Sequence, residues 1–323
     1  MHSRSLAKAW PVAAAISLLV AIRPAAAEPA ALPVRDDAAL QLALEDARVR
    51  FLEAQRFDRL DVTVLLAAAD GSWRRGSVGG DRPWYPASCV KLGFGIAAAQ
   101  WCEAGRRAPD CLDDAVLPML RDSDNVATGV VVDAITGVTN GPVDGADYDA
   151  WQARRLYTEE LLQRHGLLRG QRFGNKTYPT NSGEMPEGLE RLLLERHGRN
   201  SMHADGSARL MLALVLEEFG TPAKDYLRSR LRRPLVSENS AMGGAFPEGT
   251  VYESKIGEAY DTLAEIVHAE LPDGRRLIIA AYSNGRDPEG PDDQDQTVLA
   301  GFAALLLERL PPSGPAAGTA RND

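Results

Sequence analysis

Ser88 and Lys91 have the residue types and the spacing that nucleophilic catalysis by a serine requires. A serine hydroxyl is a poor nucleophile until a nearby base removes its proton. On a helix, a lysine three residues later lies on the same face, where its amine can reach the hydroxyl. At the start of the helix that we predict over residues 88–104, the helix dipole also favours the developing negative charge. The alternative is that Ser88 is only an N-cap, since Ser5 and Lys8 have the same spacing without catalytic meaning.

A second polar group, Ser123-Asp124-Asn125, follows later in the chain. A second hydroxyl beside the nucleophile can relay a proton to a leaving nitrogen, and an amide two residues on can hold an amide group of a substrate. The alternative for this segment is a polar loop or a helix cap.

A third group, Lys255-Ile256-Gly257, lies at the end of a strand that we predict over residues 250–256. A lysine here supplies positive charge for a substrate carboxylate and favours the ionised forms of nearby nucleophiles. A glycine lets a ligand approach the backbone closely. The next N–H, that of Glu258, can pair with the N–H of Ser88 as an oxyanion hole. The alternative is a solvated lysine at a strand end.

The order of the three groups carries more information than any one of them. S-x-x-K opening a helix, then S-D-N, then K-x-G on a strand near the C-terminus form the motif set of class A β-lactamases and penicillin-binding proteins. The chain therefore resembles the class A β-lactamase-like serine hydrolases over about residues 37–310. A strand hairpin before Pro86 and a Pro247-Glu248-Gly249 turn before the third group agree with this resemblance.

The resemblance implies a role for each of these residues and no metal or organic cofactor. It implies that Ser88 is the acylated nucleophile, that Lys91 is the base that activates it, and that Ser123 carries a proton to the leaving nitrogen. Asn125 would bind an amide group of the substrate, and Lys255 would bind a substrate carboxylate and tune Ser123. Gly257 would allow the ligand to approach, and the N–H groups of Ser88 and Glu258 would form the oxyanion hole. The implied partner is a small molecule, a β-lactam or a cell-wall-like amide.

The third group departs from the family pattern at Ile256, where the family has a serine or threonine. Losing the hydroxyl's charge-assisted hydrogen bond to a substrate carboxylate costs on the order of 1.5–3 kcal/mol. We expect the bulk of Ile256 to narrow that side of the site. A Glu258 side chain that faced the site would repel an anionic substrate.

The carboxylate that removes the acyl group in this family lies in an E-x-x-L-N segment, which this chain lacks. Glu184, Glu187 and Glu190 are the candidates, and the alternative for each is a surface acid. Without such an acid, deacylation would be slow and the protein would stay acylated, as a penicillin-binding protein does.

The remaining pattern predicts strands at both ends of the chain and helices between them. The predicted strands are 61–69, 72–78, 250–256, 262–271 and 275–283, and the predicted helices are 37–54, 88–104, 113–136, 151–165, 204–219, 223–232 and 297–310. Arg232-Arg233 is expected to be a solvated helix end.

These elements indicate a mixed α+β or α/β fold, with one antiparallel sheet built from both chain ends, flanked by helices, and an inserted all-helical domain. We place a sheet-and-helix domain at 28–86 plus 247–310, a helical domain at 87–246 and a flexible tail at 311–323.

The first 27 residues predict a secretory signal peptide, with a basic start, an apolar run over residues 9–22 and small residues at 25–27. The alternative is a membrane anchor, but the run is shorter than the roughly 20 residues that a span needs. We expect a periplasmic or secreted protein without stable membrane insertion after cleavage. The formal net charge of −9 argues against a nucleic-acid partner, because phosphate binding needs a basic face. Nothing indicates an oligomer, so a monomer is expected.

Cys102 and Cys111 flank a polar loop and can form a disulfide in an oxidising compartment. Such a bridge would contribute roughly 2–3 kcal/mol, and the sequence leaves open whether it forms. Cys89 would then be a buried free thiol. The histidine and cysteine spacings match no zinc site.

Three functional hypotheses follow. The first is a β-lactamase that hydrolyses the β-lactam amide through an acyl-enzyme on Ser88. The second is a D,D-peptidase, amidase or esterase of the same fold. The third is a penicillin-binding or sensor domain that is acylated without turnover.

Overall fold

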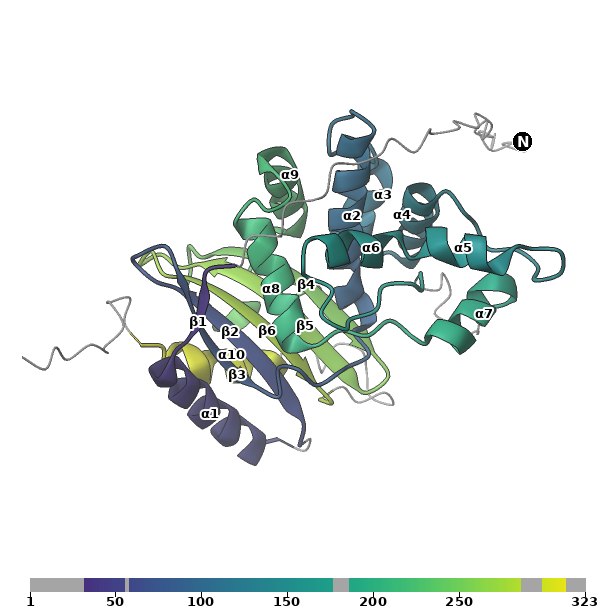
Figure 1. The fold of residues 1–323 in the computed structure, drawn as a ribbon. Coiled ribbons are helices and arrows are strands. Elements are labelled where there is room, and N and C mark those ends of the chain that lie inside the picture. Colours follow the sequence, from purple (N-terminus) through teal and green to yellow (C-terminus); the bar gives the residue numbers. More distant parts are fainter. Residues whose placement is uncertain (1–31, 56–57, 177–185, 286–297, 312–323) are drawn as a thin grey trace, which may run out of the picture.

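Six strands form one sheet in the computed structural model, which describes residues 32–55, 58–176, 186–285 and 298–311 (Figure 1). The strands are β1 (Val34–Asp36), β2 (Leu60–Ala67), β3 (Trp73–Val78), β4 (Val251–Ala259), β5 (Thr262–Glu270) and β6 (Arg276–Ser283), in the order β1-β3-β2-β6-β5-β4. All neighbours are antiparallel except β1 and β3.

The pairing of β2 with β6 joins the two ends of the chain in this sheet, with Val62 opposite Ala281. The prediction of one antiparallel sheet built from both chain ends, with helices between them, is therefore confirmed, and the short parallel strand β1 is an addition to it. The Asp70-Gly71 turn closes the β2–β3 hairpin, and Gly71 has a φ of +83°, which a glycine adopts without steric cost.

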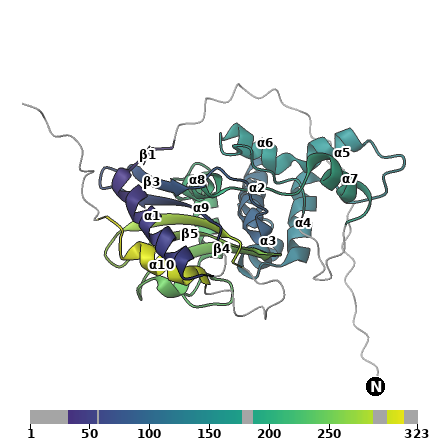
Figure 2. The same ribbon diagram turned by 90° about the horizontal axis from the view of Figure 1, so that it is seen from below.

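Each face of the sheet is covered by helices. Successive residues of a strand point to opposite faces, and the buried strands carry apolar residues on both faces. Helices α1 (Ala38–Glu53) and α10 (Val298–Leu307) pack on one face, over side chains such as Val64 and Ile279 (Figure 2). The other face carries side chains such as Ile278 and packs against helix α8 (Ala204–Val215).

The remaining helices lie on the side of the sheet away from α1 and α10 (Figures 1 and 2). They are α2 (Lys91–Ala104), α3 (Asp113–Arg121), α4 (Asn125–Thr136), α5 (Tyr148–Arg155), α6 (Tyr157–Arg164), α7 (Gly188–His197) and α9 (Thr221–Leu231), with short 3₁₀ turns η1 (Ala87–Val90) and η2 (Gly243–Ala245). The buried helix α2 packs against α3, α4, α6 and α9, so it is the centre of this layer.

The structure corrects several predicted elements. The helix predicted over 113–136 is two helices, because the chain reverses at Ser123, whose φ is +58°, before α4 begins. The helix predicted over 151–165 is also divided, into α5 and α6. Helix α7 lies in a segment for which no helix or strand was predicted, and it is held by the buried Leu189 and Leu193. Strand β4 runs to Ala259, so Lys255 and Gly257 lie within it rather than at its end.

Cys102 and Cys111 form a disulfide that ties the end of α2 to the turn before α3. Cys89 is a buried free thiol. In the part of the chain that the structure describes, no helix is long and apolar enough to cross a membrane. The predicted signal peptide lies outside the described residues.

Candidate active site

Ser88 lies in the 3₁₀ turn η1, immediately before helix α2, and η1 rests against strand β4. Ala87 precedes it with a φ of +45°, a left-handed conformation that is strained for a residue with a side chain. The turn is closed by a hydrogen bond from the Cys89 N–H to the Pro86 carbonyl, 3.0 Å. The serine is therefore held on a fixed backbone rather than on a mobile loop.

Gly257 is what allows η1 to lie so close to β4. A Cβ atom at this position would lie 2.5 Å from the Pro86 carbonyl oxygen and 2.9 Å from the Cys89 nitrogen. The Cys89 thiol also donates to the Lys255 carbonyl at 3.4 Å. We predicted that a ligand would approach Gly257 closely, but the segment that approaches it is the backbone of η1. This contact places Ser88 beside the strand that carries Lys255.

Lys91 is fully buried, and its amine reaches the Ser88 hydroxyl as expected, together with polar atoms of Ser123 and Asn125. Its Nζ lies 2.9 Å from Ser88 Oγ, 2.5 Å from the Ser123 carbonyl oxygen, 3.2 Å from Ser123 Oγ and 2.7 Å from Asn125 Oδ1. Burial lowers the pKa of this amine to about 7, against an opposing effect of the Asp124 carboxylate. A large fraction of the amine is therefore uncharged near neutral pH.

Lys255 approaches the same hydroxyl from strand β4. Its Nζ donates to Ser123 Oγ at 3.0 Å and to the carbonyl of Ile256 at 2.9 Å. Burial, and then repulsion by Lys91, lower the pKa of Lys255 well below its ordinary value. The Ser123 hydroxyl thus lies between two amines, one on α2 and one on β4.

The local sequence explains how Ser123 and Asn125 are presented. The Asp124 carboxylate caps α4 by accepting the Ala127 N–H at 2.7 Å, so α4 begins at Asn125. The left-handed backbone at Ser123 costs of the order of 1–3 kcal/mol, and the hydrogen bond from Lys91 to the Ser123 carbonyl helps to hold it. The structure thus brings Ser88, Lys91, Ser123, Asn125 and Lys255 into one connected group.

A model of the β-lactamase enzyme family matches residues 110–310, more than half of the chain. The chain belongs to this β-lactamase family. The matched segment includes Ser123, Asn125 and Lys255, whereas Ser88 and Lys91 precede it. The resemblance inferred from the three motifs is confirmed at the level of the family.

The chain is also similar to individual known proteins. Golvesin of Dictyostelium discoideum is 30% identical over 283 residues, which are 85% of this chain and 49% of Golvesin, so the chain spans about half the length of this curated relative. An ancestral class A β-lactamase (GNCA) matches with a TM-score of 0.60 and 18% identity, covering 84% of this chain and all of that one. An acyl-enzyme complex of a PBP-A variant with penicillin G matches with a TM-score of 0.56 and 17% identity, covering 85% and 98% of the two chains. At these identities the two solved structures establish the likeness of fold.

Ile256, the departure from the family's third motif, does not narrow the site as expected. It is 5% exposed and belongs to the apolar cluster on the α1 and α10 face, with Leu263 and Met242. The reason is the alternation of β4, in which Ile256 lies on the face opposite Lys255 and Gly257. Glu258 pairs with Leu263 in the same ladder, so the alternation also directs its side chain to the Ile256 face.

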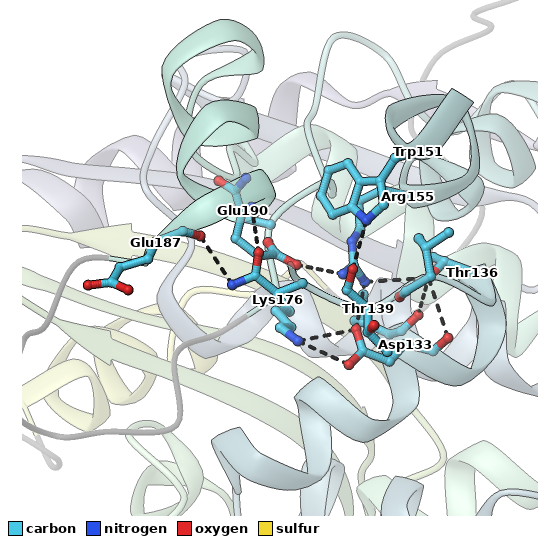
Figure 3. A network of polar contacts seen from close by, with 12 residues as sticks. Asp133, Thr136, Thr139, Trp151, Arg155, Lys176, Glu187 and Glu190 are labelled. Carbon is cyan, nitrogen blue, oxygen red and sulfur yellow. Dashed lines mark hydrogen bonds and ion pairs between the residues drawn. The ribbon is translucent and has the colours of Figure 1, made fainter. Parts of the chain in front are cut away.

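The three candidate deacylating acids have different outcomes. Glu184 lies outside the described residues. Glu187 is exposed at the start of α7, and Figure 3 shows its carboxylate pointing away from the neighbouring polar groups. Glu190 is 1% exposed, so the alternative prediction of a surface acid is wrong for this residue. Neither Glu187 nor Glu190 forms a hydrogen bond or ion pair with Ser88 or Lys91.

Glu190 belongs instead to a polar network that joins several helices (Figure 3). Its carboxylate lies 2.6 Å from a guanidinium nitrogen of the fully buried Arg155, which also donates to Asp133 at 2.9 Å. Lys176 donates to Asp133 from the segment after α6. Burial raises the pKa of Glu190, against the opposing effect of Arg155. This arrangement gives Glu190 a structural role between α4, α5 and α7.

Arg233 is the residue near the site that the sequence analysis misplaced. It is 8% exposed rather than solvated, and its guanidinium donates to the backbone carbonyls of Leu120, Arg121 and Ser254. Its neighbour Arg232 does have the exposed side chain that was predicted, at 59%. The sequence does not distinguish two adjacent arginines. In the structure, Arg232 forms an antiparallel bridge with Glu253 of β4, and this pairing determines which of the two side chains faces inward.

Proposed function

We propose that the protein is a serine hydrolase that forms an acyl-enzyme on Ser88 and acts as a class A-like β-lactamase. The observation that carries the proposal is the position of the Lys91 amine, 2.9 Å from Ser88 Oγ and 3.2 Å from Ser123 Oγ. One group can thus take the proton of the nucleophile and pass it toward the leaving group. The assignment to the β-lactamase family supports this chemistry.

Acylation proceeds in a chain of proton transfers. The uncharged Lys91 amine takes the Ser88 proton while Oγ attacks the carbonyl carbon of the substrate, and the N–H groups of Ser88 and Glu258 stabilise the oxyanion. When the C–N bond breaks, Ser123 gives its proton to the leaving nitrogen. Lys91 then returns the proton it took to Ser123, so the enzyme ends with the charges it began with.

Lys255 has two roles in this mechanism. Its amine holds the Ser123 hydroxyl at 3.0 Å, and in its charged form it attracts a carboxylate of the substrate. Asn125, which accepts a hydrogen bond from Lys91, presents its amide next to them for an amide group of the substrate.

Among the described residues, hydrolysis of the acyl-enzyme has no assigned carboxylate base, since Glu187 and Glu190 form no hydrogen bond or ion pair with Lys91 or Ser88. Lys91 is then the group available to activate water, and we expect deacylation to be slower than acylation. The PBP-A variant that matches this fold is described as an acyl-enzyme complex with penicillin G, which supports an acylated state of the same kind here.

A D,D-peptidase, amidase or esterase of the same fold is the second candidate, and it is favoured because no base for deacylation is assigned in the part of the chain that the structure describes. The predicted signal peptide supports export to a compartment where cell-wall-like amides occur, and we propose a periplasmic or secreted location on that ground.

The test is incubation of the purified protein with a chromogenic cephalosporin, with intact mass measured at intervals. Turnover that is lost in Ser88→Ala and retained in the control Ser72→Ala, a serine of the β2–β3 turn, would support the β-lactamase. A lasting adduct on Ser88 without turnover would favour the second candidate. No adduct and no colour would exclude β-lactams as substrates.

A further inference from the structure

Arg233 connects two parts of the chain that each carry a residue of the proposed site. Its Nε donates to the Ser254 carbonyl at 3.0 Å, and its two terminal nitrogens donate to the carbonyls of Arg121 at 2.6 Å and Leu120 at 2.5 Å. Its own backbone N–H donates to the Tyr252 carbonyl at 2.9 Å. The end of α3 is thereby fastened to β4 through one side chain.

Both ends of this connection lie next to residues of the mechanism. Leu120 and Arg121 end α3 shortly before Ser123, and Ser254 immediately precedes Lys255. The left-handed backbone at Ser123 persists only if the surrounding structure fixes it. Lys91 holds the Ser123 carbonyl, and Arg233 holds the turn that enters Ser123.

Burial of a charged guanidinium is unfavourable unless its donors are used. In the described part of the chain, no carboxylate forms an ion pair with Arg233, and its burial lowers the pKa of the group. Its partners are three backbone carbonyls on two elements, an arrangement that suits the planar fork of arginine and not a single lysine ammonium.

We propose that Arg233 is a positioning residue, which keeps Ser123 in register with Lys255 so that the Ser123 hydroxyl can protonate the leaving nitrogen. The inference rests on the proposed function. It predicts that the loss of Arg233 slows acylation of Ser88 most when the leaving group needs a proton.

The experiment compares two acyl donors, a β-lactam amide and an activated p-nitrophenyl ester, whose leaving phenolate needs no proton from Ser123. Acylation of Ser88 is followed by intact mass. In Arg233→Met we expect β-lactam acylation to fall about 10- to 100-fold, since a displacement of about 1 Å can reduce a rate by that much. We expect ester acylation to fall less than about threefold. The exposed neighbour provides the matched control, because Arg232→Met should leave both rates unchanged.

Three further comparisons decide the outcome. In Ser123→Ala, acylation by the β-lactam should fall more than acylation by the ester, as in Arg233→Met. The double variant Ser123→Ala, Arg233→Met should be acylated only slightly more slowly than Ser123→Ala alone. If Arg233→Met does not fold, Arg233→Lys, which retains the charge and one or two of the hydrogen bonds, should show a smaller loss confined to the β-lactam. Equal losses with both donors, or none, would overturn the inference. Failure of both donors to acylate the wild-type protein would overturn the proposed function and, with it, this inference.

Discussion

At the scale of single residues, burial changes what the two lysines of the site can do. An exposed lysine is charged at neutral pH and cannot take a proton, whereas burial lowers the pKa of Lys91 to about 7. Both amines are fully buried and meet at the Ser123 hydroxyl. The motifs indicate the residue types, but the burial that would allow Lys91 to act as a base is visible only in the structure.

The lowered pKa predicts how acylation depends on pH. Lys91 must be uncharged to accept the Ser88 proton, so the rate should rise with pH through about 7. Between pH 8 and pH 5.5 we expect a fall of about 30-fold, because the uncharged fraction drops nearly tenfold per pH unit below the pKa. Stopped-flow measurement of Ser88 acylation, with folding checked at each pH, provides the test. A rate that stays constant over this range would show that Lys91 is not the base.

Ile256 gives a second prediction at this scale, because it faces the core and not the site. Ile256→Ala should lower the free energy of unfolding by about 2–4 kcal/mol. Val236→Ala, at a position 81% exposed, should change it by less than about 0.5 kcal/mol. Urea denaturation measures both. A change in KM without loss of stability in Ile256→Ala would mean that its side chain lines the site after all.

At the scale of elements, the site depends on how closely η1 lies against β4. The Pro86 carbonyl and the Cys89 amide occupy the space that any side chain at position 257 would need. A glycine within a strand is normally a weakness, so its presence here indicates a close backbone approach.

Gly257→Ala should therefore displace η1 and with it Ser88. We expect acylation to fall by at least about 100-fold, because nucleophile and base would lose their alignment. Gly244→Ala is the matched control, since a Cβ there meets nothing within 4 Å, and its acylation rate should match that of the wild type. Intact-mass kinetics would measure both, and an active Gly257→Ala protein would contradict this account of the site.

The helix boundaries show what the sequence predicts well and what it does not. Periodicity places α1 and α8 and the central strands nearly correctly, because their apolar faces pack on one sheet. It misses the break at Ser123, which distant contacts from Lys91 and Arg233 help to fix. The local signal of this break is the helix cap named above as the alternative for residues 123–125, since Asp124 caps α4.

At the scale of the whole molecule, the sheet and the helical layer meet at the site. The pairing of β2 with β6 joins the two chain ends in the sheet, while α2 supplies Lys91 and the turn between α3 and α4 supplies Ser123. The order of the motifs predicts this meeting. It does not predict α7, because none of the three motifs lies in the segment between α6 and α8.

Helix α7 is joined to the rest of the molecule through Glu190, which contacts Arg155 on α5, while Arg155 contacts Asp133 on α4. If this contact is structural, Glu190→Gln should lower the free energy of unfolding by about 3–5 kcal/mol, because one partner of a buried ion pair is lost. It should leave the lifetime of the Ser88 acyl-enzyme unchanged.

Glu187→Gln is the matched control, an exposed glutamate at the start of the same helix, and it should change neither quantity. Thermal denaturation and the decay of the mass adduct measure the two effects separately. A longer-lived acyl-enzyme in Glu190→Gln would identify Glu190 as a group that assists deacylation. Because its carboxylate is held by Arg155 and not by Lys91, we expect the loss of stability alone.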